Sequence, residues 1–388
     1  MRAANYRKSN QLTLLHRGAE FFPALIQAFD TAESEIYLET YIFAKDVTAD
    51  LVQAALSRAA LRGVQVYVLA DWLGTGAARC ALLAKEFSAT GVHYKSFNPW
   101  FRRGLARTHR KLIVVDGRFA FLGGLNINDD MLSDEGSQTP LPSPRWDFAV
   151  SISGPLVADI QAEATAQWAR QHFKYLRHHL QNLRLLKTLR HKAAHAVAEA
   201  ALVVRDNLRN RSTIQRNLLQ ALGRARHTAF LVTPYFAPDR KLRQALAIAA
   251  GRGVTVTLLI GVGQFRMQDA VAQSFYPKLS LAGVKIVEYR KTQLHGKVAV
   301  IDDEWATIGS SNFDGLSLFV NHEANIMVRD PDFAGSLREL IAQGVAEGVV
   351  ISPAEVARIS WVRRTGNRLA YFLYKSVLQL ITAGKYTK

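Results

Sequence analysis

One pattern occurs twice in the sequence, as His109-Arg-Lys111-Leu-Ile-Val-Val-Asp116 and as His295-Gly-Lys297-Val-Ala-Val-Ile-Asp302. In both copies the lysine follows the histidine by two positions, and the aspartate follows the lysine by five. The apolar run between lysine and aspartate is typical of a buried strand. Because side chains alternate along a strand, the histidine and lysine of each copy are expected to point into the same cleft.

The residues after each copy also match. Gly123-Gly124-Leu-Asn126 follows the first copy, and Gly309-Ser310-Ser-Asn312 follows the second at the same distance. A single His-x-Lys-x4-Asp arises readily by chance, so alone it is weak. Two copies with the same continuation argue against the alternative that these are ordinary core histidines on two strands.

The elements around the motifs repeat in the same order. Helices are expected at residues 22–32 and 49–60 and again at 214–225 and 242–250, and strands at 36–43, 65–70, 92–97, 112–115 and 148–152 and again at 229–236, 255–260, 284–289, 298–301 and 324–328. Helices that alternate with short Val/Ile/Leu-rich strands indicate an α/β sandwich. We therefore predict two duplicated α/β/α sandwich domains, which form a bilobal pseudo-twofold unit with one shared active site.

This reading divides the chain into four parts. The first domain covers residues 1–163 and the second covers 201–352, with a basic connecting segment at 164–200 and a basic tail at 353–388. Residues 164–198 contain no Asp or Glu, and in the tail basic side chains flank apolar ones at helical spacing. Each basic stretch is either a solvated helix on the core or an interfacial helix with its cations on anionic lipid head groups.

The overall charge limits the partners. Lys and Arg outnumber Asp and Glu by 49 to 32, which gives a net charge of +17. Such an excess attracts anionic polymers or anionic membrane surfaces.

The first residues have no apolar run typical of a signal peptide, and no apolar stretch reaches the roughly 18 residues of a membrane span. The single cysteine, Cys80, excludes an intramolecular disulfide and suits a reducing compartment.

The repeated residues suit phosphoryl transfer without a metal. Lys111 and Lys297 are expected to place positive charge on the non-bridging oxygens of a phosphodiester, and Asn126 and Asn312 to donate hydrogen bonds there. A neutral imidazole can attack phosphorus, while an imidazolium can protonate the leaving group. The sequence contains no convincing set of metal ligands, so we expect neither a metal nor a cofactor.

Each histidine also requires a carboxylate that fixes its tautomer. The candidates are Asp147 and Glu323, each of which precedes an apolar strand late in its repeat. The alternative is that they are solvent-facing acids at strand edges. Asp116 and Asp302 follow strands, and we expect them to brace the site through hydrogen bonds without taking part in proton transfer. The supporting residues of this predicted site are Asn126, Asn312, Ser310, Gly124, Asp147 and Glu323.

With these motifs, the chain resembles the phospholipase D superfamily over nearly its whole length, and within it the bacterial cardiolipin synthases, most of all type B. The resemblance rests on residues 38–43, on the two motifs with their Gly-Gly and Gly-Ser continuations, and on residues 309–325. It departs from the membrane-spanning types in lacking an N-terminal pair of spans. Membrane attachment would then depend on the basic, apolar surface of the chain itself.

The resemblance implies a phosphatidyl transfer between two phosphatidylglycerol molecules that yields cardiolipin and glycerol. It implies a covalent phosphatidyl-histidine, with His109 as the nucleophile and His295 as the acid and base. The symmetry of the two motifs does not itself decide between the histidines. It also leaves open whether the acceptor is phosphatidylglycerol, phosphatidylethanolamine or a small alcohol.

Six further residues are candidates for the substrate mouth. Transfer must exclude water from the phosphorus, so aromatic and basic side chains are expected near the entrance. Ordinary packing is the alternative for each of them. They are Tyr41 and Tyr235, which hold matching places after the first strand of each half, and Trp100, Phe101, Arg102 and Arg103.

Three other functions remain open: a phospholipase that uses water, a nuclease or other phosphodiesterase, and an inactive membrane-binding scaffold. Because the basic residues are interleaved with long apolar side chains, we expect no nucleic-acid partner. We expect an enzyme that lies peripherally on the cell membrane, at its cytoplasmic face, with an anionic phospholipid surface as its partner.

Overall fold

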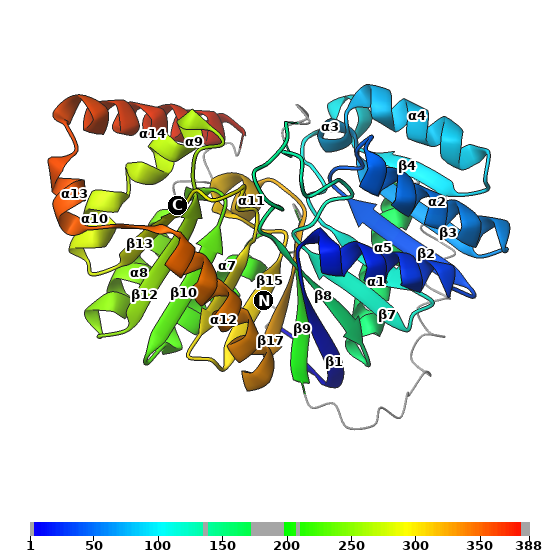
Figure 1. Ribbon diagram of the computed structural model, residues 1–388, viewed down its shortest axis with the longest axis horizontal. Helices are drawn as coiled ribbons and strands as arrows, with labels where there is room; N and C mark the ends of the chain where they lie inside the picture. The colour runs from blue at the N-terminus through cyan, green and yellow to red at the C-terminus, as the bar shows by residue number, and fades with distance from the viewer. Residues whose placement is uncertain (1–3, 135–138, 172–197, 207–209, 382–388) are drawn as a thin grey trace.

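The computed structural model describes residues 4–134, 139–171, 198–206 and 210–381. Across these residues one mixed sheet runs through the whole molecule in the order β18-β13-β12-β10-β14-β15-β17-β9-β1-β8-β7-β6-β2-β3-β4. Figure 1 shows two lobes, one from each half of the chain, which meet where β9 and β1 lie side by side.

The first half supplies one lobe. Its strands are β1 (Arg7–His16), β2 (Glu35–Thr40), β3 (Gln65–Asp71), β4 (His93–Phe97), β5 (Arg102–Leu105), β6 (Leu112–Val115), β7 (Phe119–Gly123) and β8 (Phe148–Ser153). Its helices are α1 (Arg17–Asp30), α2 (Val47–Leu61), α3 (Trp72–Thr75), α4 (Ala77–Ser88), the 3-10 turn η1 (Pro99–Phe101) and α5 (Leu156–Arg170).

The second half supplies the other lobe. Its strands are β9 (Ala198–Arg205), β10 (Thr228–Thr233), β11 (Phe236–Ala237), β12 (Thr255–Gly261), β13 (Lys285–Tyr289), β14 (Val298–Ile301), β15 (Trp305–Gly309), β16 (Phe313–Asp314), β17 (Glu323–Arg329) and β18 (Val349–Ile351). Its helices are α7 (Thr213–Arg224), α8 (Arg240–Gly251), α9 (Arg266–Gln273), α10 (Tyr276–Leu281), α11 (Gly315–Phe319), α12 (Pro331–Glu347), α13 (Pro353–Arg358) and α14 (Trp361–Ile381).

The predicted duplication is confirmed by the sheet. In each half, three parallel strands continue into an antiparallel set that carries the motif: β4-β3-β2 lead to β6-β7-β8, and β13-β12-β10 lead to β14-β15-β17. The motif strands β6 and β14 hold the same place in both halves and are wholly buried. Strands β1 and β9 also correspond, and they pair antiparallel with each other. The two halves therefore share one continuous sheet.

Helices cover both faces of this sheet, as the predicted α/β/α arrangement requires. In the first half α1, α2 and α4 pack on one face and α5 on the other. In the second half α7, α8 and α10 pack on one face and α12 on the other. The cores under α5 and α12 merge into one, because α5 reaches β9 and α12 reaches β1. Apolar burial across the seam thus holds the halves in a fixed relation.

The sequence pattern did not predict β1 and β9, the two strands where the halves meet. Helix α5 runs to Arg170, past the expected boundary at 163, and β9 begins at Ala198, within the expected connecting segment. Most of that basic segment, residues 172–197, lies outside the described residues. The basic tail does form a long helix, α14, which lies beside α9 along the upper edge of its lobe (Figure 1).

Candidate active site

His109 lies just before β6 and is held by residues of the second half. Its backbone N–H donates to the carbonyl of His322 at 2.9 Å. Its Nδ1 lies 3.0 Å from the carbonyl oxygen of Ser310 and 3.1 Å from Oε2 of Glu323. A carboxylate at Nδ1 favours the tautomer with the proton on Nδ1, which leaves Nε2 free for chemistry.

His295 has the reciprocal arrangement. Its backbone N–H donates to the carbonyl of Trp146 at 2.9 Å, and its Nδ1 lies 2.6 Å from Oδ2 of Asp147. Asp147 thus belongs to the first half and serves the histidine of the second, whereas Glu323 does the opposite. The sequence singled out both acids but not this crossing. One site therefore requires both halves.

The two lysines of the motifs are fully buried at this centre. Lys111 donates from Nζ to the carbonyl oxygen of His109 at 2.9 Å, and Lys297 donates in the same way to that of His295. Burial, together with repulsion from Lys297, lowers the pKa of Lys111 to about 7, and burial lowers the pKa of Lys297 to about 8. Two cations held close together in a buried site provide a strong attraction for an anionic phosphodiester.

The histidines are also shifted by burial. Burial lowers the pKa of His109 to about 4, although Glu323 acts in the opposite direction. The pKa of His295 is also lowered, because burial and the Lys297 cation outweigh the opposing effect of Asp134 and Asp147. His109 is therefore neutral at pH 7 in the unliganded site, the state that a nucleophile requires.

The residue that follows the first glycine after each motif contacts the carboxylate of its own half. A Cβ on Gly124 would lie 2.2 Å from Oδ1 of Asp147, so only glycine fits there. In the second half Ser310 stands at the corresponding place, and its hydroxyl donates to Oε2 of Glu323. Both supporting residues thus act on the carboxylates that hold the histidines.

The asparagines Asn126 and Asn312 are buried next to these turns. Oδ1 of Asn126 accepts the backbone N–H of Ile42 at 3.2 Å, which orients the amide and leaves its NH2 group as a donor. Oδ1 of Asn312 is buried and accepts no hydrogen bond from the residues that the structure describes. The asparagines are thus not equivalent in their contacts.

Asp116 and Asp302 lie at the opposite ends of the motif strands. Asp116 has a φ of 52° and accepts backbone N–H groups from Glu33, Ser34 and Glu35 at 2.8–2.9 Å. Asp302 has a φ of 53° and accepts those of residues 226–228 in the same manner. Aspartate tolerates this left-handed conformation, and its carboxylate ties the strand end to the neighbouring turn. Their bracing therefore acts at the far end of the strand.

Of the residues expected at the mouth, Tyr41 lies closest to the chemistry. Its ring contacts the ring of His109 edge-on at 4.9 Å between centroids, and Nζ of Lys111 lies 5.2 Å from its centroid. Tyr235 instead packs on Phe265 at 5.9 Å. The repeat therefore places the two tyrosines in different environments.

The other mouth residues form an exposed cluster. Trp100 and Phe101 contact Trp72 at 5.1 and 5.6 Å between ring centroids, and both are exposed, Trp100 by 71%. Arg102 is also exposed. The side chain of Arg103 lies outside what the structure describes. Among the described residues, the ring contacts of this cluster are with Trp72 and not with the histidines.

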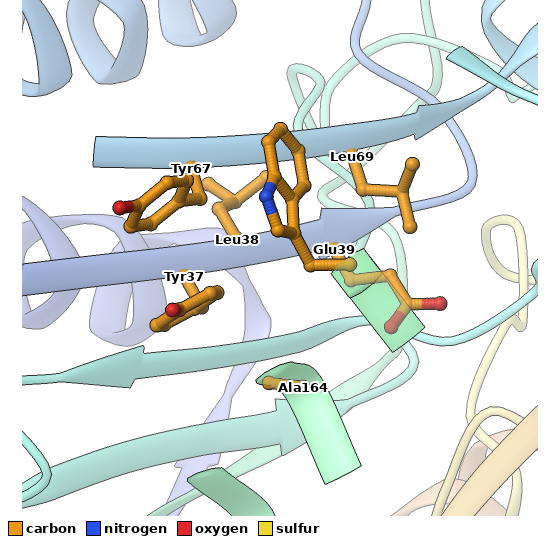
Figure 2. A pocket seen from close by; sticks show the side chains of 7 residues that line it. Tyr37, Leu38, Glu39, Tyr67, Leu69 and Ala164 are labelled. Atoms are coloured by element: carbon orange, nitrogen blue, oxygen red, sulfur yellow. The ribbon is translucent and has the colours of Figure 1, made fainter. Parts of the chain in front are cut away.

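A buried acidic pair fixes the segment before His109. Glu39 accepts the hydroxyl hydrogen bond of Thr108, and Oδ2 of Asp71 accepts the Thr108 backbone N–H at 2.8 Å. Glu39 borders a cavity of about 10 Å³ that is also lined by Tyr37 and Tyr67 (Figure 2). That volume suffices for about one water molecule, so this cavity is not a lipid site.

Sequence reasoning missed Asp134. Its Oδ2 lies 3.2 Å from Nε2 of His295, on the side of the ring opposite Asp147. The loop between Asn126 and Asp147 that carries it is about twice as long as its counterpart between Asn312 and Glu323. This difference in length between the repeats was the available signal.

Comparison with known proteins agrees with the fold and the motifs. The family model described as "Cardiolipin synthase, PLD-like domain" matches residues 25–139 and 218–344. Cardiolipin synthase B of Salmonella typhi is 35% identical over 96% of this chain and 87% of its own length, and that of Escherichia coli K12 is 34% identical over 97% and 91%. The crystal structure of phosphatidylserine synthase from Haemophilus influenzae superposes with a TM-score of 0.71, covering 98% of this chain and 96% of that one at 15% identity.

The matched family segments contain both motifs and cover more than half of the chain, and the curated relatives align along almost all of it. The structural neighbour is too distant in sequence to indicate more than the shared fold. The chain belongs to the cardiolipin synthase family of phospholipase D-like phosphatidyltransferases.

Proposed function

We propose that this enzyme transfers a phosphatidyl group from one phosphatidylglycerol to a second, with release of glycerol. The observation that carries the proposal is the crossed pair of histidine–carboxylate contacts, His109 with Glu323 and His295 with Asp147, around two buried lysines. The names of the curated relatives support cardiolipin as the product.

In the first step, Nε2 of His109 attacks phosphorus, and the bond from phosphorus to the glycerol oxygen breaks. His295 gives its Nε2 proton to that oxygen, so glycerol leaves as a neutral molecule. Lys111 and Lys297 stabilise the charge on the non-bridging oxygens. The step leaves a phosphatidyl group on His109 and a neutral His295.

In the second step, neutral His295 takes a proton from a hydroxyl of another phosphatidylglycerol. The resulting oxygen attacks phosphorus, and the bond to Nε2 of His109 breaks. Cardiolipin forms, and His295 is again protonated. The same nitrogen of His295 therefore serves the departing and the arriving hydroxyl in turn.

The surroundings of the histidines support this division of roles. His109 faces one carboxylate, and its pKa of about 4 keeps it neutral and nucleophilic. His295 lies between two carboxylates, Asp147 at Nδ1 and Asp134 at Nε2, which oppose the lowering of its pKa by burial and Lys297. The two anions stabilise the imidazolium that His295 becomes when it carries the proton.

We also propose that the enzyme works on an anionic membrane surface, at the cytoplasmic face. Among the described residues, no helix is long and apolar enough to cross a bilayer. Helix α14 packs through Tyr371, Tyr374 and Leu378. Its other side presents an exposed apolar face: Leu369, Phe372, Leu373, Val377 and Leu380.

The chemistry around this face suits lipid. Arg368 beside it is exposed, and the whole chain carries a net charge of +17. Trp72, which contacts Trp100 and Phe101, begins α3, and Figure 1 places α3 and α14 on the same upper side of the molecule. Apolar side chains with neighbouring cations favour the interface of an anionic bilayer. The single buried cysteine is compatible with a reducing compartment.

The test is mass spectrometry of the products formed from phosphatidylglycerol vesicles. The wild type should yield cardiolipin and glycerol over many turnovers, His109→Ala should yield neither, and His295→Ala should yield no cardiolipin. His227→Ala, which removes an exposed histidine, should behave as the wild type. Phosphatidic acid without cardiolipin would indicate a hydrolase instead.

A trapping experiment separates the two histidines. His295→Ala lacks the base for the second step, so a phosphatidyl adduct should accumulate on His109 with release of one glycerol per enzyme. It should form more slowly than in the wild type, because the acid of the first step is also missing, and peptide mass spectrometry after rapid quenching detects it. An adduct on His295 in the His109→Ala variant would reverse the assignment.

A further inference from the structure

Asp134 is anchored in its loop by its backbone and by one of its two carboxylate oxygens. Its Oδ1 accepts hydrogen bonds from Nδ2 of Asn128 at 2.6 Å and pairs with Nη1 of Arg145 at 2.9 Å. Its backbone N–H donates to Oε1 of Gln293 at 3.2 Å. These contacts anchor the residue and leave the second oxygen, Oδ2, for something else.

That second oxygen faces the reacting centre. Oδ2 lies 3.2 Å from Nε2 of His295, and within the described part of the chain it accepts no hydrogen bond. Burial alone would raise the pKa of Asp134, but Arg145 and His295 outweigh burial and hold the pKa below its usual range. The carboxylate is therefore an anion with unused acceptor capacity.

An anion at this position is costly for phosphodiester binding, because it repels the substrate phosphate in a buried site. Arg145 and Asn128 already find their acceptor in Oδ1, so anchoring the loop does not require the second oxygen. A hydrogen-bond donor on the substrate would offset the repulsion and satisfy Oδ2.

The position of such a donor follows from the proposed function, on which this inference rests. The head-group oxygen that exchanges a proton with His295 must lie within about 3 Å of Nε2. Oδ2 is next to the same nitrogen. Substituents on the second carbon of the head group are then the atoms best placed to reach Oδ2.

We propose that Asp134 selects lipid head groups that carry a hydrogen-bond donor on the second carbon from the phosphate ester oxygen. The 2-hydroxyl of a glycerol head group and the ammonium of an ethanolamine head group both meet this condition. A propyl chain would leave the buried oxygen unpaired and is therefore rejected.

Space for a polar head group borders this residue. Gln293, which accepts the Asp134 amide hydrogen bond, lines an open hollow of about 450 Å³ together with Thr292, Asp269 and Arg290. Nε2 of Gln293 is buried and has no hydrogen-bond partner among the described residues. A lining with both charges and a free amide donor suits a hydroxyl-bearing group better than an alkyl chain.

The test is a competition within one vesicle. Vesicles contain equal amounts of phosphatidylglycerol, phosphatidylethanolamine and phosphatidylpropanol, and mass spectrometry follows the loss of each lipid whatever the product. A shared surface removes differences in membrane binding. The wild type should consume at least one of the first two about 10-fold or more faster than phosphatidylpropanol.

Variants assign the preference to Asp134. In Asp134→Ala, the consumption rates of the three lipids should differ by less than about threefold. This corresponds to the loss of most of the contribution of one charge-assisted hydrogen bond. Asp134→Asn should retain the preference for glycerol, because an amide oxygen still accepts from a hydroxyl, and lose that for ethanolamine. Asp129→Asn removes a carboxylate from the same loop, where its Oδ1 accepts the Met131 backbone N–H, and should retain both preferences.

Each outcome has a definite meaning. If wild type consumes phosphatidylpropanol as fast as the other lipids, or if Asp134→Ala retains the wild-type preference, the inference is overturned while the proposed transfer stands. Circular dichroism establishes that each variant is folded. If wild type consumes none of the three lipids, the proposed function falls, and the inference falls with it.

Discussion

At the scale of single residues, two copies of one motif have acquired different surroundings. His109 contacts Glu323 and the Ser310 carbonyl, whereas His295 lies between Asp147 and Asp134. The difference arises from the longer loop in the first half. Identical motif residues therefore lie in different electrostatic surroundings, which affect their protonation to different extents.

The Glu323 carboxylate should be essential to that arrangement. Glu323→Gln keeps the size of the side chain but removes the charge that orients His109 and stabilises the cationic ring of its phosphatidyl adduct. We expect transfer to fall by roughly 100- to 10,000-fold, as for other carboxylate–histidine pairs. Steady-state assays on phosphatidylglycerol vesicles measure this, with the exposed Glu339→Gln as the control. A loss below threefold would contradict the role.

Anion affinity should depend on pH through the lysines. Each lysine is a cation below its pKa, so sulfate, whose own charge is constant, should bind less tightly as the pH rises through about 7 for Lys111 and about 8 for Lys297. Calorimetric titration with sulfate at several pH values measures the effect. Lys111→Arg stays charged and should remove the step near pH 7. A sulfate affinity that is constant from pH 6 to 9 would argue against the lowered pKa values of the two lysines.

At the scale of elements, each motif strand has a chemical end and a structural end. The histidine end meets the other half of the chain, while the aspartate end ties the strand to its neighbouring turn. The buried run between them keeps the two ends in register. The fixed spacing of the motif therefore combines the needs of the site with those of the sheet.

Asp116→Ala should lower stability more than activity. It leaves three backbone N–H groups without their acceptor and places alanine at a φ of 52°, where a β-carbon is disfavoured. Because the site is partly exposed and water can replace the acceptor, we expect a loss of about 1–3 kcal/mol in the free energy of unfolding. Urea denaturation measures it, and kcat per folded molecule should stay within about threefold. A large fall in kcat at unchanged stability would place Asp116 in the chemistry.

At the scale of the whole molecule, a continuous sheet and a shared core under α5 and α12 set the distance between the two motifs. The site lies between the halves, and the apolar face of α14 lies on the outside of the second lobe.

The α14 face should govern vesicle binding. Phe372→Asp replaces an exposed apolar side chain with an anion, and should weaken binding to phosphatidylglycerol vesicles by about 10-fold or more, since a buried aromatic ring contributes roughly 2–3 kcal/mol. Vesicle pelleting at several salt concentrations measures this. Ile248→Asp changes another exposed apolar residue, on α8, and should have little effect. Equal losses in both variants would mean that charge alone governs binding.

Local sequence patterns predicted much of the fold and the chemical groups of the site. The alternation of apolar residues predicted most strands and helices, and the matching continuations of two motifs predicted a duplicated α/β/α fold. The residue types of the motifs, with Asp147 and Glu323, indicated phosphoryl transfer by two histidines. These features depend on neighbours within a few positions, so periodicity and spacing reveal them.

Only the tertiary structure decided which groups meet. Asp147 and His295 are 148 positions apart, and Glu323 and His109 are 214 apart, so their crossed pairing depends on how β1 and β9 join the halves. Asp134 reaches His295 through an irregular loop with no periodic pattern. The sequence by itself determined the fold class and the chemical groups, whereas long-range packing determined their partners, because contacts between distant segments depend on the geometry of the folded sheet.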